Sequence, residues 1–382
     1  MNHELLFSKG KLKIGYFGIL RSPVSWVKVA RELCFALIKL GVELNIYERK
    51  GFLYNPKFKL KKELEEKILP YQQPADIVFT FEHPRNYHYL SGNFKIGLLV
   101  YESTKVPKKW VEYVNEYLDL LLVPSTFCSR IFIEGGVNKE RVKILPYGVD
   151  HNIFHSQVSP YPFKTKKHFK FLNISLPHKR KGIDILLEAY TRAFKKSHDV
   201  CLVIKTNYNP KEFRRKHFKW EYDDIEELVR RYKNQIDAPE ILLINKKEPD
   251  EIIPSYYKGV NCFVHCARAE GFGMSILEAF ASYIPVIATG WGGHLDFCNE
   301  DNAFLLKYNL RKANEIQYDN QDAQSYICEP NVEDLMEKMS LVYNGGKEIT
   351  RRIENAYSTS LNYSWEKIVL KLLEILSKSK CL

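Results

Sequence analysis

The sequence has no long apolar run, since no stretch approaches the roughly 18 to 20 consecutive apolar residues that span a bilayer. Its first residues, MNHELLFSKGKLK, lack the apolar core of a secretory signal peptide. Its eight cysteines form no Cys-x-x-Cys pair, which argues against a zinc ribbon or a disulfide framework. We therefore expect a cytoplasmic chain whose thiols are reduced and mostly buried.

Possible metal ligands are few in the sequence. Cys262, His265 and Cys266 lie close together, but alternation along the strand predicted there puts both cysteines on one face and the histidine on the other. The acidic pair Asp223 and Asp224, in EYDDIEEL, is interpreted as the solvated start of a helix. We expect no metal and no other cofactor.

The segment FGILRS after the first predicted strand does not supply Gly-x-Gly-x-x-Gly, which argues against a dinucleotide-dependent oxidoreductase. The sequence also has no low-complexity tract, and its 45% hydrophobic and 13% aromatic content supports well-filled cores. A length of 382 residues, at roughly 150 residues per domain, predicts two domains.

What the sequence does have is positive charge, with 57 basic against 46 acidic residues and a net charge of +11. The excess is clustered at residues 57–62, 164–170, 178–182 and 211–220. Such clusters favour an anionic partner, and a nucleic acid, an anionic lipid surface or a phosphorylated small molecule each fits. No nucleic-acid reader motif accompanies them, so a basic nucleic-acid-binding protein is the weakest of these alternatives.

Strand and helix patterns alternate in two series separated by a polar, proline-containing segment at 151–168, which reads as a linker. The predicted strands are 11–20, 42–48, 75–82, 94–103, 118–125 and 142–150, then 169–176, 200–206, 239–245, 260–266 and 284–290. Helices are predicted between most of them. The alternation is typical of two doubly wound α/β domains, at residues 1–160 and 161–360, with a ligand site in the cleft that they face.

The segment HCARAEGFGMSILEAFA at 265–281 predicts a strand, a glycine turn and a helix. Gly271 and Gly273 let the backbone approach a ligand, and the N–H groups that open the helix favour an anion. Glu270 and Glu278 bracket this turn, and a carboxylate accepts hydrogen bonds from two hydroxyls. The pattern suits a ligand with polyol groups on both sides of phosphate, such as a nucleotide sugar.

This stretch resembles the motif of two glutamates separated by seven residues in the family-4 retaining glycosyltransferases, which have the two-domain GT-B fold. The resemblance extends over most of the chain, through LLLVPSTFCSRIFIEGGVNKERVKILPYGVD, RKGIDILLEAY and IPVIATGWGGHLDF. The segment SWEKIVLKLLEIL (364–376) is similar to the last helix of that family, which returns to the first domain. The resemblance therefore implies that residues 361–382 belong with residues 1–160.

Carried over by residue, the resemblance implies that Glu270 contacts the hydroxyls of the donor hexose and that Glu278 binds the ribose. Lys181 matches the lysine on the diphosphate, with Arg180 beside it. The backbone from Gly271 through Phe272 and Gly273 to Met274 would meet the sugar and the diphosphate, and the backbone around Asn245 would meet the base. The resemblance implies retention of configuration, with the acceptor hydroxyl attacking on the face that the diphosphate leaves.

The chain departs from the family pattern at three places. Leu176 occupies the position of a usual arginine, for which either Arg180 or Lys205 could substitute. Gly18 stands alone where many members have two glycines, and Glu102, in VYES, stands where some have a histidine. Gly18 and Glu102 are expected on the acceptor side of the site.

The leading hypothesis is a metal-independent hexosyltransferase that uses a nucleotide-diphosphate sugar and a saccharide or lipid-linked acceptor. Its basic segments suggest peripheral contact with an anionic inner membrane face. The alternative enzyme is a nucleotide-sugar epimerase or phosphorylase on the same framework.

Overall fold

The structure is a computed structural model that describes residues 13–51, 53–208, 224–313 and 324–379. By its contacts the chain divides into unit 1, which holds Met1–Tyr101, Val106–Gly148 and Tyr363–Leu382, and unit 2, which holds Glu102–Lys105 and Val149–Asn362. Residues 102–105, 149–160 and 361–362, which were expected in the first domain, lie in unit 2.

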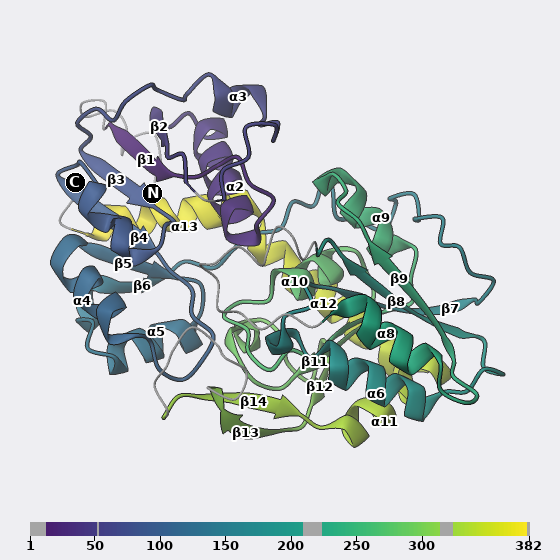
Figure 1. Ribbon diagram of the computed structural model, residues 1–382. Helices are drawn as coiled ribbons and strands as arrows, with labels where there is room; N and C mark the ends of the chain where they lie inside the picture. The colour runs from purple at the N-terminus through teal and green to yellow at the C-terminus, as the bar shows by residue number, and fades with distance from the viewer. Residues whose placement is uncertain (1–12, 52, 209–223, 314–323, 380–382) are drawn as a thin grey trace. The chain divides into compact units, whose positions relative to one another are not determined.

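Unit 1 is a parallel sheet with helices around it (Figure 1). Its helices and strands are β1 (Ile14–Gly18), α2 (Ser25–Lys39), β2 (Leu44–Glu48), α3 (Lys62–Glu65), β3 (Ile77–Thr80), β4 (Phe94–Leu98), α4 (Lys108–Tyr117), β5 (Leu120–Val123), α5 (Thr126–Glu134), β6 (Val142–Ile144) and α13 (Trp365–Lys378). Over the described residues the six strands are paired in the order β2-β1-β3-β4-β5-β6, all parallel.

Burial explains why these segments form the sheet and its cover. Every residue of β3 and of β5 is buried, as in a parallel sheet covered on both faces. Helix α2 buries Val27, Ala30 and Leu37, and α13 buries Leu372 and Leu376. These helices meet the sheet around a small internal cavity lined by Leu37, Leu372, Leu376 and strand residues. The C-terminal helix therefore completes the core of unit 1.

Unit 2 repeats the plan with additions at its end. Its elements are β7 (Phe169–Ile174), α6 (Ile183–Ala193), β8 (Val200–Thr206), α8 (Ile225–Lys233), β9 (Glu240–Asn245), α9 (Ile253–Lys258), β10 (Cys262–His265), α10 (Met274–Ala281), β11 (Val286–Thr289), β12 (Phe304–Leu306), β13 (Tyr308–Lys312), β14 (Tyr326–Pro330), α11 (Val332–Asn344) and α12 (Lys347–Ser360). The parallel order over the described residues is β12-β11-β10-β7-β8-β9. Strands β13 and β14 form a separate antiparallel hairpin.

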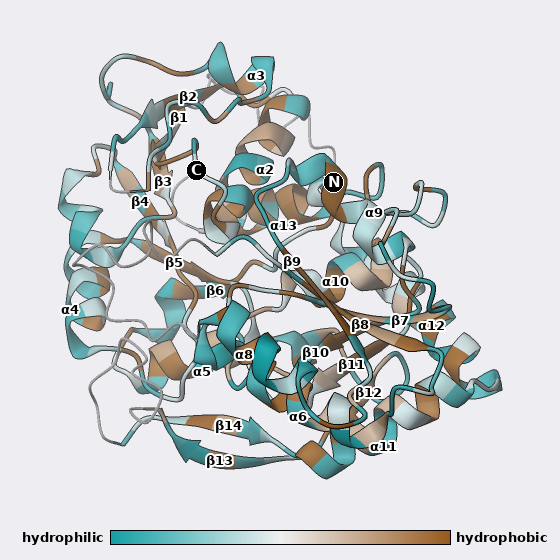
Figure 2. Ribbon diagram, turned by 45° about the vertical axis from the view of Figure 1, so that its right-hand side comes forward, coloured by the Kyte–Doolittle hydropathy of each residue, from teal (hydrophilic) through white to brown (hydrophobic). Residues whose placement is uncertain are grey.

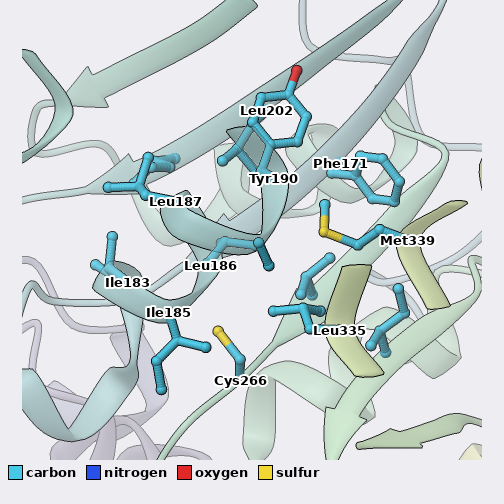
Figure 3. Packing of buried hydrophobic residues seen from close by; sticks show 14 of the residues in the cluster. Phe171, Ile183, Ile185, Leu186, Leu187, Tyr190, Leu202, Cys266, Leu335 and Met339 are labelled. Carbon is cyan, nitrogen blue, oxygen red and sulfur yellow. The ribbon is translucent and has the colours of Figure 1, made fainter. Parts of the chain in front are cut away.

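The core of unit 2 lies between its sheet and helices α6 and α11. Leu186 and Tyr190 of α6 pack with Phe171 of β7 and Met339 of α11, as Figure 3 shows. Figure 2 shows the hydropathy of the sheet and of a helix that covers it: β7, β8 and β9 are largely hydrophobic, while α8 is largely hydrophilic. The helix α8 buries Ile225 and Val229 and is amphipathic, as expected of a helix that covers one face of a sheet.

Several predicted segments differ in length or character from the structure. The strand predicted at 94–103 ends at Leu98, and residues 102–105 that follow it belong to unit 2. The strand predicted at 142–150 ends at Ile144, shortly before Pro146, which has no N–H for a strand ladder. The segment predicted as a linker is packed, since Tyr161 stacks on Tyr256 at 4.1 Å between ring centroids. As predicted, this connection from β6 to β7 contains no helix or strand, but part of it packs on α9.

The strand order places a topological switch point in each sheet. In unit 2, β7 pairs with β8 on one side and with β10 on the other, so the chain leaves β7 and β10 in opposite directions. In unit 1, β1 lies in the same way between β2 and β3. Ligands of doubly wound sheets bind beyond the carboxyl ends of the strands at such points. The segments that follow β7 and β10 are therefore the first place to look for a site.

Candidate functional site

The segment after β10 turns sharply into α10 at Gly273, which has φ 88°. A Cβ added to Gly273 would lie 2.9 Å from the Cβ of His294, so both its conformation and its surroundings require glycine. Among the described residues no side chain caps α10 and no acidic residue lies in its first turn. The positive end of this helix is thus left for an anion.

The segment after β7 forms a 3₁₀ turn at Lys179–Lys181, which we call the basic turn, followed by Gly182 and α6. The Nδ1 atom of His178 accepts a hydrogen bond from the N–H of Arg180 at 3.0 Å. Burial, together with Arg180 and Lys181, lowers the pKa of His178 to about 3, so His178 is neutral and its ring can accept this bond. The histidine fixes the start of the basic turn.

The two segments meet at the carboxylate of Glu270. The Lys181 Nζ donates to Glu270 Oε2 at 2.6 Å, and Arg180 Nη1 lies 3.6 Å from the same oxygen. Arg180 Nη1 also donates to the carbonyl oxygen of Ala269 at 2.8 Å. The three charged side chains are 14–20% exposed. The structure therefore brings Glu270, Lys181 and Arg180 together at the switch point of unit 2.

Two further side chains complete this cluster. His265, at the end of β10, places Nε2 3.3 Å from Glu270 Oε2. Glu102 places Oε1 3.4 Å from Arg180 Nη2, within unit 2. Glu102 was predicted from the sequence and His265 was not. His265 is 3% exposed and lies in the alternating pattern of strand β10. That pattern gives no sign that the histidine has a charged neighbour.

Burial and charge act in opposite directions on the groups of this cluster. Burial alone would raise the pKa of Glu270, but Lys181, His265 and Arg180 hold it well below its usual range. Burial, reinforced by Arg180, lowers the pKa of Lys181, and burial raises the pKa of Glu102. The site thus holds an ionised Glu270 and two cations that are only partly solvated, where electrostatic interactions are stronger than in water.

Glu278 lies on α10 and is oriented by Tyr257 of α9. The hydroxyl of Tyr257 donates to Glu278 Oε2 at 3.0 Å and lies 3.2 Å from the carbonyl oxygen of Ser275. Tyr257 is fully buried, so its hydroxyl holds the carboxylate from the protein side. Sequence reasoning missed Tyr257, whose signal is confined to the aromatic pair in IIPSYYKG.

Lys205 lies one residue before the end of β8, and Asn245 is the last residue of the neighbouring strand β9. Lys205 is 3% exposed, and its Nζ donates to the carbonyl oxygens of Thr206 and Lys246 at 2.9 and 2.5 Å. Asn245 Nδ2 lies 3.5 Å from Glu226 Oε1. These contacts tie the ends of β8 and β9 together, whereas Arg180 lies beside Lys181. Of the two substitutes for the usual arginine, the contacts favour Arg180.

Gly18 lies in unit 1 and is the last residue of β1, at the switch point of that sheet. A Cβ on Gly18 would approach the Tyr16 hydroxyl to 2.5 Å. The next N–H, of Ile19, donates to the buried carboxylate of Glu82, which also binds Arg49 at 2.7 Å. Glu82, which sequence reasoning did not single out, therefore holds the segment after β1. The acceptor-side role of Gly18 stays a prediction.

The residues considered as metal ligands have other contacts. Asp224 caps α8 by accepting from the N–H of Glu227 at 3.1 Å, while Asp223 lies outside the described residues, as does the basic segment 211–220. Cys266 Sγ contacts the carbonyl oxygen of Gly182 at 3.2 Å, and Cys262 Sγ contacts the carbonyl oxygen of Phe263 at 3.6 Å. Within the described ranges, no three His, Cys, Asp or Glu side chains are grouped closely enough to hold a metal ion.

Comparison with known proteins gives the family. Residues 160–359 match the family model of glycosyl transferases group 1. The chain is 24% identical over 282 residues to the capsular polysaccharide biosynthesis glycosyltransferase CapM of Staphylococcus aureus, covering 70% of this chain and 66% of that protein. Its matches to other curated relatives cover from 38% to 76% of their length.

Solved structures agree on the fold. A glycosyltransferase from Rickettsia africae is 19% identical, with a TM-score of 0.69 and coverage of 97% of this chain and 100% of that one. The Anabaena protein HepE, solved in complex with UDP-glucose, is 14% identical, with a TM-score of 0.68 and coverage of 96% and 100%. The two Rossmann-like parallel sheets are those of GT-B glycosyltransferases, as the sequence predicted.

No helix within the described ranges combines the length and the apolar character needed to cross a bilayer. The match to the family model spans the basic turn, the segment around Glu270 and both strands of the switch point in unit 2. The chain therefore belongs to the group 1 glycosyltransferases and is a glycosyltransferase of the GT-B fold.

Proposed function

We propose that the protein transfers a hexose, with retention of configuration and without a metal, from a nucleotide-diphosphate sugar to a hydroxyl of a saccharide or lipid-linked acceptor. One observation carries this proposal. At the switch point of unit 2, the cations of Lys181 and Arg180 converge on Glu270 beside the uncapped start of α10. This arrangement offers positive charge for a diphosphate and a carboxylate for the hydroxyls of the sugar next to it.

The diphosphate is assigned to the N–H groups of Gly271 to Met274 and to Lys181 and Arg180. In the structure, Lys181 pairs with Glu270 and Arg180 lies beside Glu102. A bound diphosphate would compete with these carboxylates for the cations and release Glu270 toward the sugar hydroxyls. Glu278, held by Tyr257, would accept the ribose hydroxyls, and the backbone around Asn245 would meet the base.

The reaction follows from these positions. The bond between the anomeric carbon and the phosphate oxygen breaks as the acceptor oxygen forms its bond on the same face. The departing diphosphate gains negative charge, which Lys181 and Arg180 would stabilise, and one of its oxygens takes the proton of the acceptor hydroxyl. Fixed cations in a partly buried site can supply the stabilisation that a metal gives elsewhere. Glu270 orients the sugar and needs no role as a base.

The relatives support the choice of ligands. HepE was solved with UDP-glucose, and CapM is named for capsular polysaccharide biosynthesis. Acceptor contacts are assigned to the segment after Gly18 in unit 1 and to Glu102. Peripheral contact with an anionic membrane face is also proposed, on the basic residues at 57–62, where Lys57 and Lys59 are exposed.

The donor is tested by thermal melting with UDP-, GDP-, ADP- and TDP-sugars. One of them should raise the melting temperature in proportion to the logarithm of its concentration above the dissociation constant. The variant Glu278→Ala should lose most of that shift while melting normally without ligand. If none of the four sugars shifts melting, the donor assignment fails. Turnover of the donor with no transfer to any acceptor would instead favour the epimerase or phosphorylase alternative.

As the pH rises, donor binding should begin to weaken at a lower pH than it would if Lys181 had the pKa of an ordinary lysine. Burial lowers the pKa of Lys181 below 10.5 in the free protein, and only its protonated form attracts the diphosphate. Affinity should therefore fall as the pH rises through this lowered pKa. Because arginine stays protonated, Lys181→Arg should remove this loss. The ratio of the wild-type affinity to the Lys181→Arg affinity is measured across pH, because ionisation of the nucleotide affects both proteins equally. A ratio that does not change with pH would contradict the assignment.

A further inference from the structure

Arg268 is a buried guanidinium held by two carboxylates. Its side chain is 5% exposed. The Nη1 and Nη2 atoms donate to the two oxygens of Asp184 at 2.9 and 2.7 Å, and Nε and Nη2 donate to those of Glu329 at 2.8 Å each. Such paired hydrogen bonds fix the orientation of the guanidinium more strictly than a single ion pair does. Arg268 lies two residues before Glu270, but these four hydrogen bonds go to Asp184 and Glu329 and none of them to Glu270.

The same residue also holds the basic turn. Arg268 Nη1 donates to the carbonyl oxygen of Lys179 at 2.6 Å, and its backbone N–H donates to that of Arg180 at 2.7 Å. Asp184, which binds the guanidinium, lies in the first turn of α6 directly after this turn. Three separate contacts thus join the segment before Glu270 to the segment that carries Lys181. None of them involves the atoms that would face a phosphate.

The other carboxylate comes from the β13–β14 hairpin. Glu329 of β14 also binds Arg311 of β13 at 2.5 Å, and the N–H of Cys328 donates to the carbonyl oxygen of Arg268 at 3.0 Å. At the opposite end of β14, Tyr326 exchanges hydrogen bonds with Thr104, and Ser325 Oγ lies 2.8 Å from Ser103 Oγ. These residues adjoin Glu102, whose carboxylate contacts Arg180.

The hairpin therefore reaches Arg180 from two sides. Through Arg268 it holds the backbone of the basic turn, and through residues 102–105 it holds the carboxylate next to the Arg180 guanidinium. We propose that Arg268 is a positioning residue, which uses the β13–β14 hairpin as an anchor to place Lys181 and Arg180 for the donor diphosphate. This inference rests on the proposed function of the same site and adds to it how the two cations are placed.

The test uses the variant Arg268→Lys. Calorimetry measures its binding of UDP, GDP, ADP and TDP, and steady-state kinetics measure its kcat and KM for hexose transfer. Lysine keeps the charge but cannot bind both carboxylates and the Lys179 carbonyl in one plane. Well below the melting transition we expect about tenfold weaker binding of the nucleotide diphosphate and a kcat lowered about 10- to 100-fold, because small misplacements of catalytic groups are costly. Glu329→Gln, which loosens only the hairpin anchor, should show a smaller change in the same direction.

Arg192 provides the matched control in the same unit. Its guanidinium also binds two carboxylates, Glu188 at 3.1 Å and Glu333 at 3.0 Å, but it is 44% exposed and remote from the basic turn in these contacts. Arg192→Lys should leave nucleotide affinity and kcat unchanged. A residue with a purely structural role would lower the melting temperature of Arg268→Lys without changing the constants of the folded protein.

The outcomes separate the two proposals. If the wild-type protein binds one of the four diphosphates and Arg268→Lys binds it within about twofold of the same affinity, the positioning role is wrong and the proposed function stands. If the wild-type protein binds none of them, the proposed function fails and this inference fails with it. Weaker binding by Arg268→Lys, with Arg192→Lys unchanged, supports both.

Discussion

Replacing Glu270 by glutamine is expected to lower the kcat of hexose transfer about 100- to 1,000-fold, the range found when one preorganised electrostatic partner is removed from an active site. Glutamine keeps the shape of the side chain but not the charge that binds Lys181 at 2.6 Å and His265 at 3.3 Å. The sugar hydroxyls would then lose their charged acceptor, while Lys181 would lose the partner that orients it in the free protein. Steady-state kinetics with the donor found by melting measures the effect.

Glu188→Gln is the matched control for this prediction, because it makes the same change at an exposed ion pair with Arg192 on α6. It should transfer hexose at the wild-type rate. Some loss of stability is expected for Glu270→Gln, since its carboxylate is buried among cations whose charges would no longer be balanced. Kinetics are therefore compared at a temperature where melting curves show both variants folded. A kcat for Glu270→Gln within about threefold of wild type would remove Glu270 from the reaction.

Replacing Gly182 by alanine is expected to damage both stability and activity. Gly182 joins the basic turn to α6 at φ 68°, a left-handed conformation that costs a residue with a Cβ about 1 kcal/mol. The added Cβ would also lie 2.1 Å from the carbonyl oxygen of Cys266, which is backbone and cannot rotate away. The basic turn would have to move away from the segment that carries Glu270. We expect a loss of several kcal/mol in unfolding free energy, on the order of the larger single-mutation effects.

Gly41→Ala separates strain from contact, because Gly41 follows the end of α2 in the left-handed conformation, at φ 79°, with nothing within 4 Å of an added Cβ. Urea unfolding should show a loss of about 1 kcal/mol for this variant and a clearly larger loss for Gly182→Ala. Transfer activity of the folded protein should be unchanged in Gly41→Ala and strongly reduced in Gly182→Ala. Equal destabilisation of the two variants, with full activity in both, would show that the close approach of Gly182 to Cys266 does not place the basic turn.

Local patterns predicted much of the fold. Strand β8 (Val200–Thr206) has the predicted bounds, and helix α5 (Thr126–Glu134) forms between two predicted strands, because each combines a strong apolar pattern with a clear signal at its ends. Ser125 caps α5 by accepting from the N–H of Cys128, and every residue of β8 is buried. Such segments carry their structural signal within their own sequence.

Other elements lack that local signal. Strand β13 is exposed or half-buried at every position, so it has no buried apolar face that would mark it as part of a core. Its partner β14 begins at Tyr326, well after β13 ends at Lys312, so the pairing is not a tight local turn. Residues 102 and 103 were assigned to the strand before them, because nothing in the local composition shows that Ser103 and Thr104 bind Ser325 and Tyr326. Tertiary contacts determine these elements.

The site shows the same division. Glu270, Glu278, Lys181 and the glycines could be found because they lie in short motifs with recognisable spacing. Tyr257 and Arg268 contact partners tens of residues away in sequence, such as the 21 positions from Tyr257 to Glu278. His265 lies close to Glu270 in sequence, but it is buried at the end of β10. A buried histidine or arginine has no pattern that distinguishes it from a core residue with a satisfied polar group. Their roles become visible only when the partners are placed in space.

The measurement that tests the central claim most directly is a crystal structure of the protein with the nucleotide sugar that gives the largest melting shift. The account predicts diphosphate oxygens within hydrogen-bond distance of the backbone N–H groups of Gly271 to Met274 and of the Lys181 amine, with the hexose hydroxyls on Glu270 and the ribose on Glu278. A nucleotide sugar bound with its diphosphate away from the start of α10, or with Glu270 still paired to Lys181 and touching no hydroxyl, would contradict it.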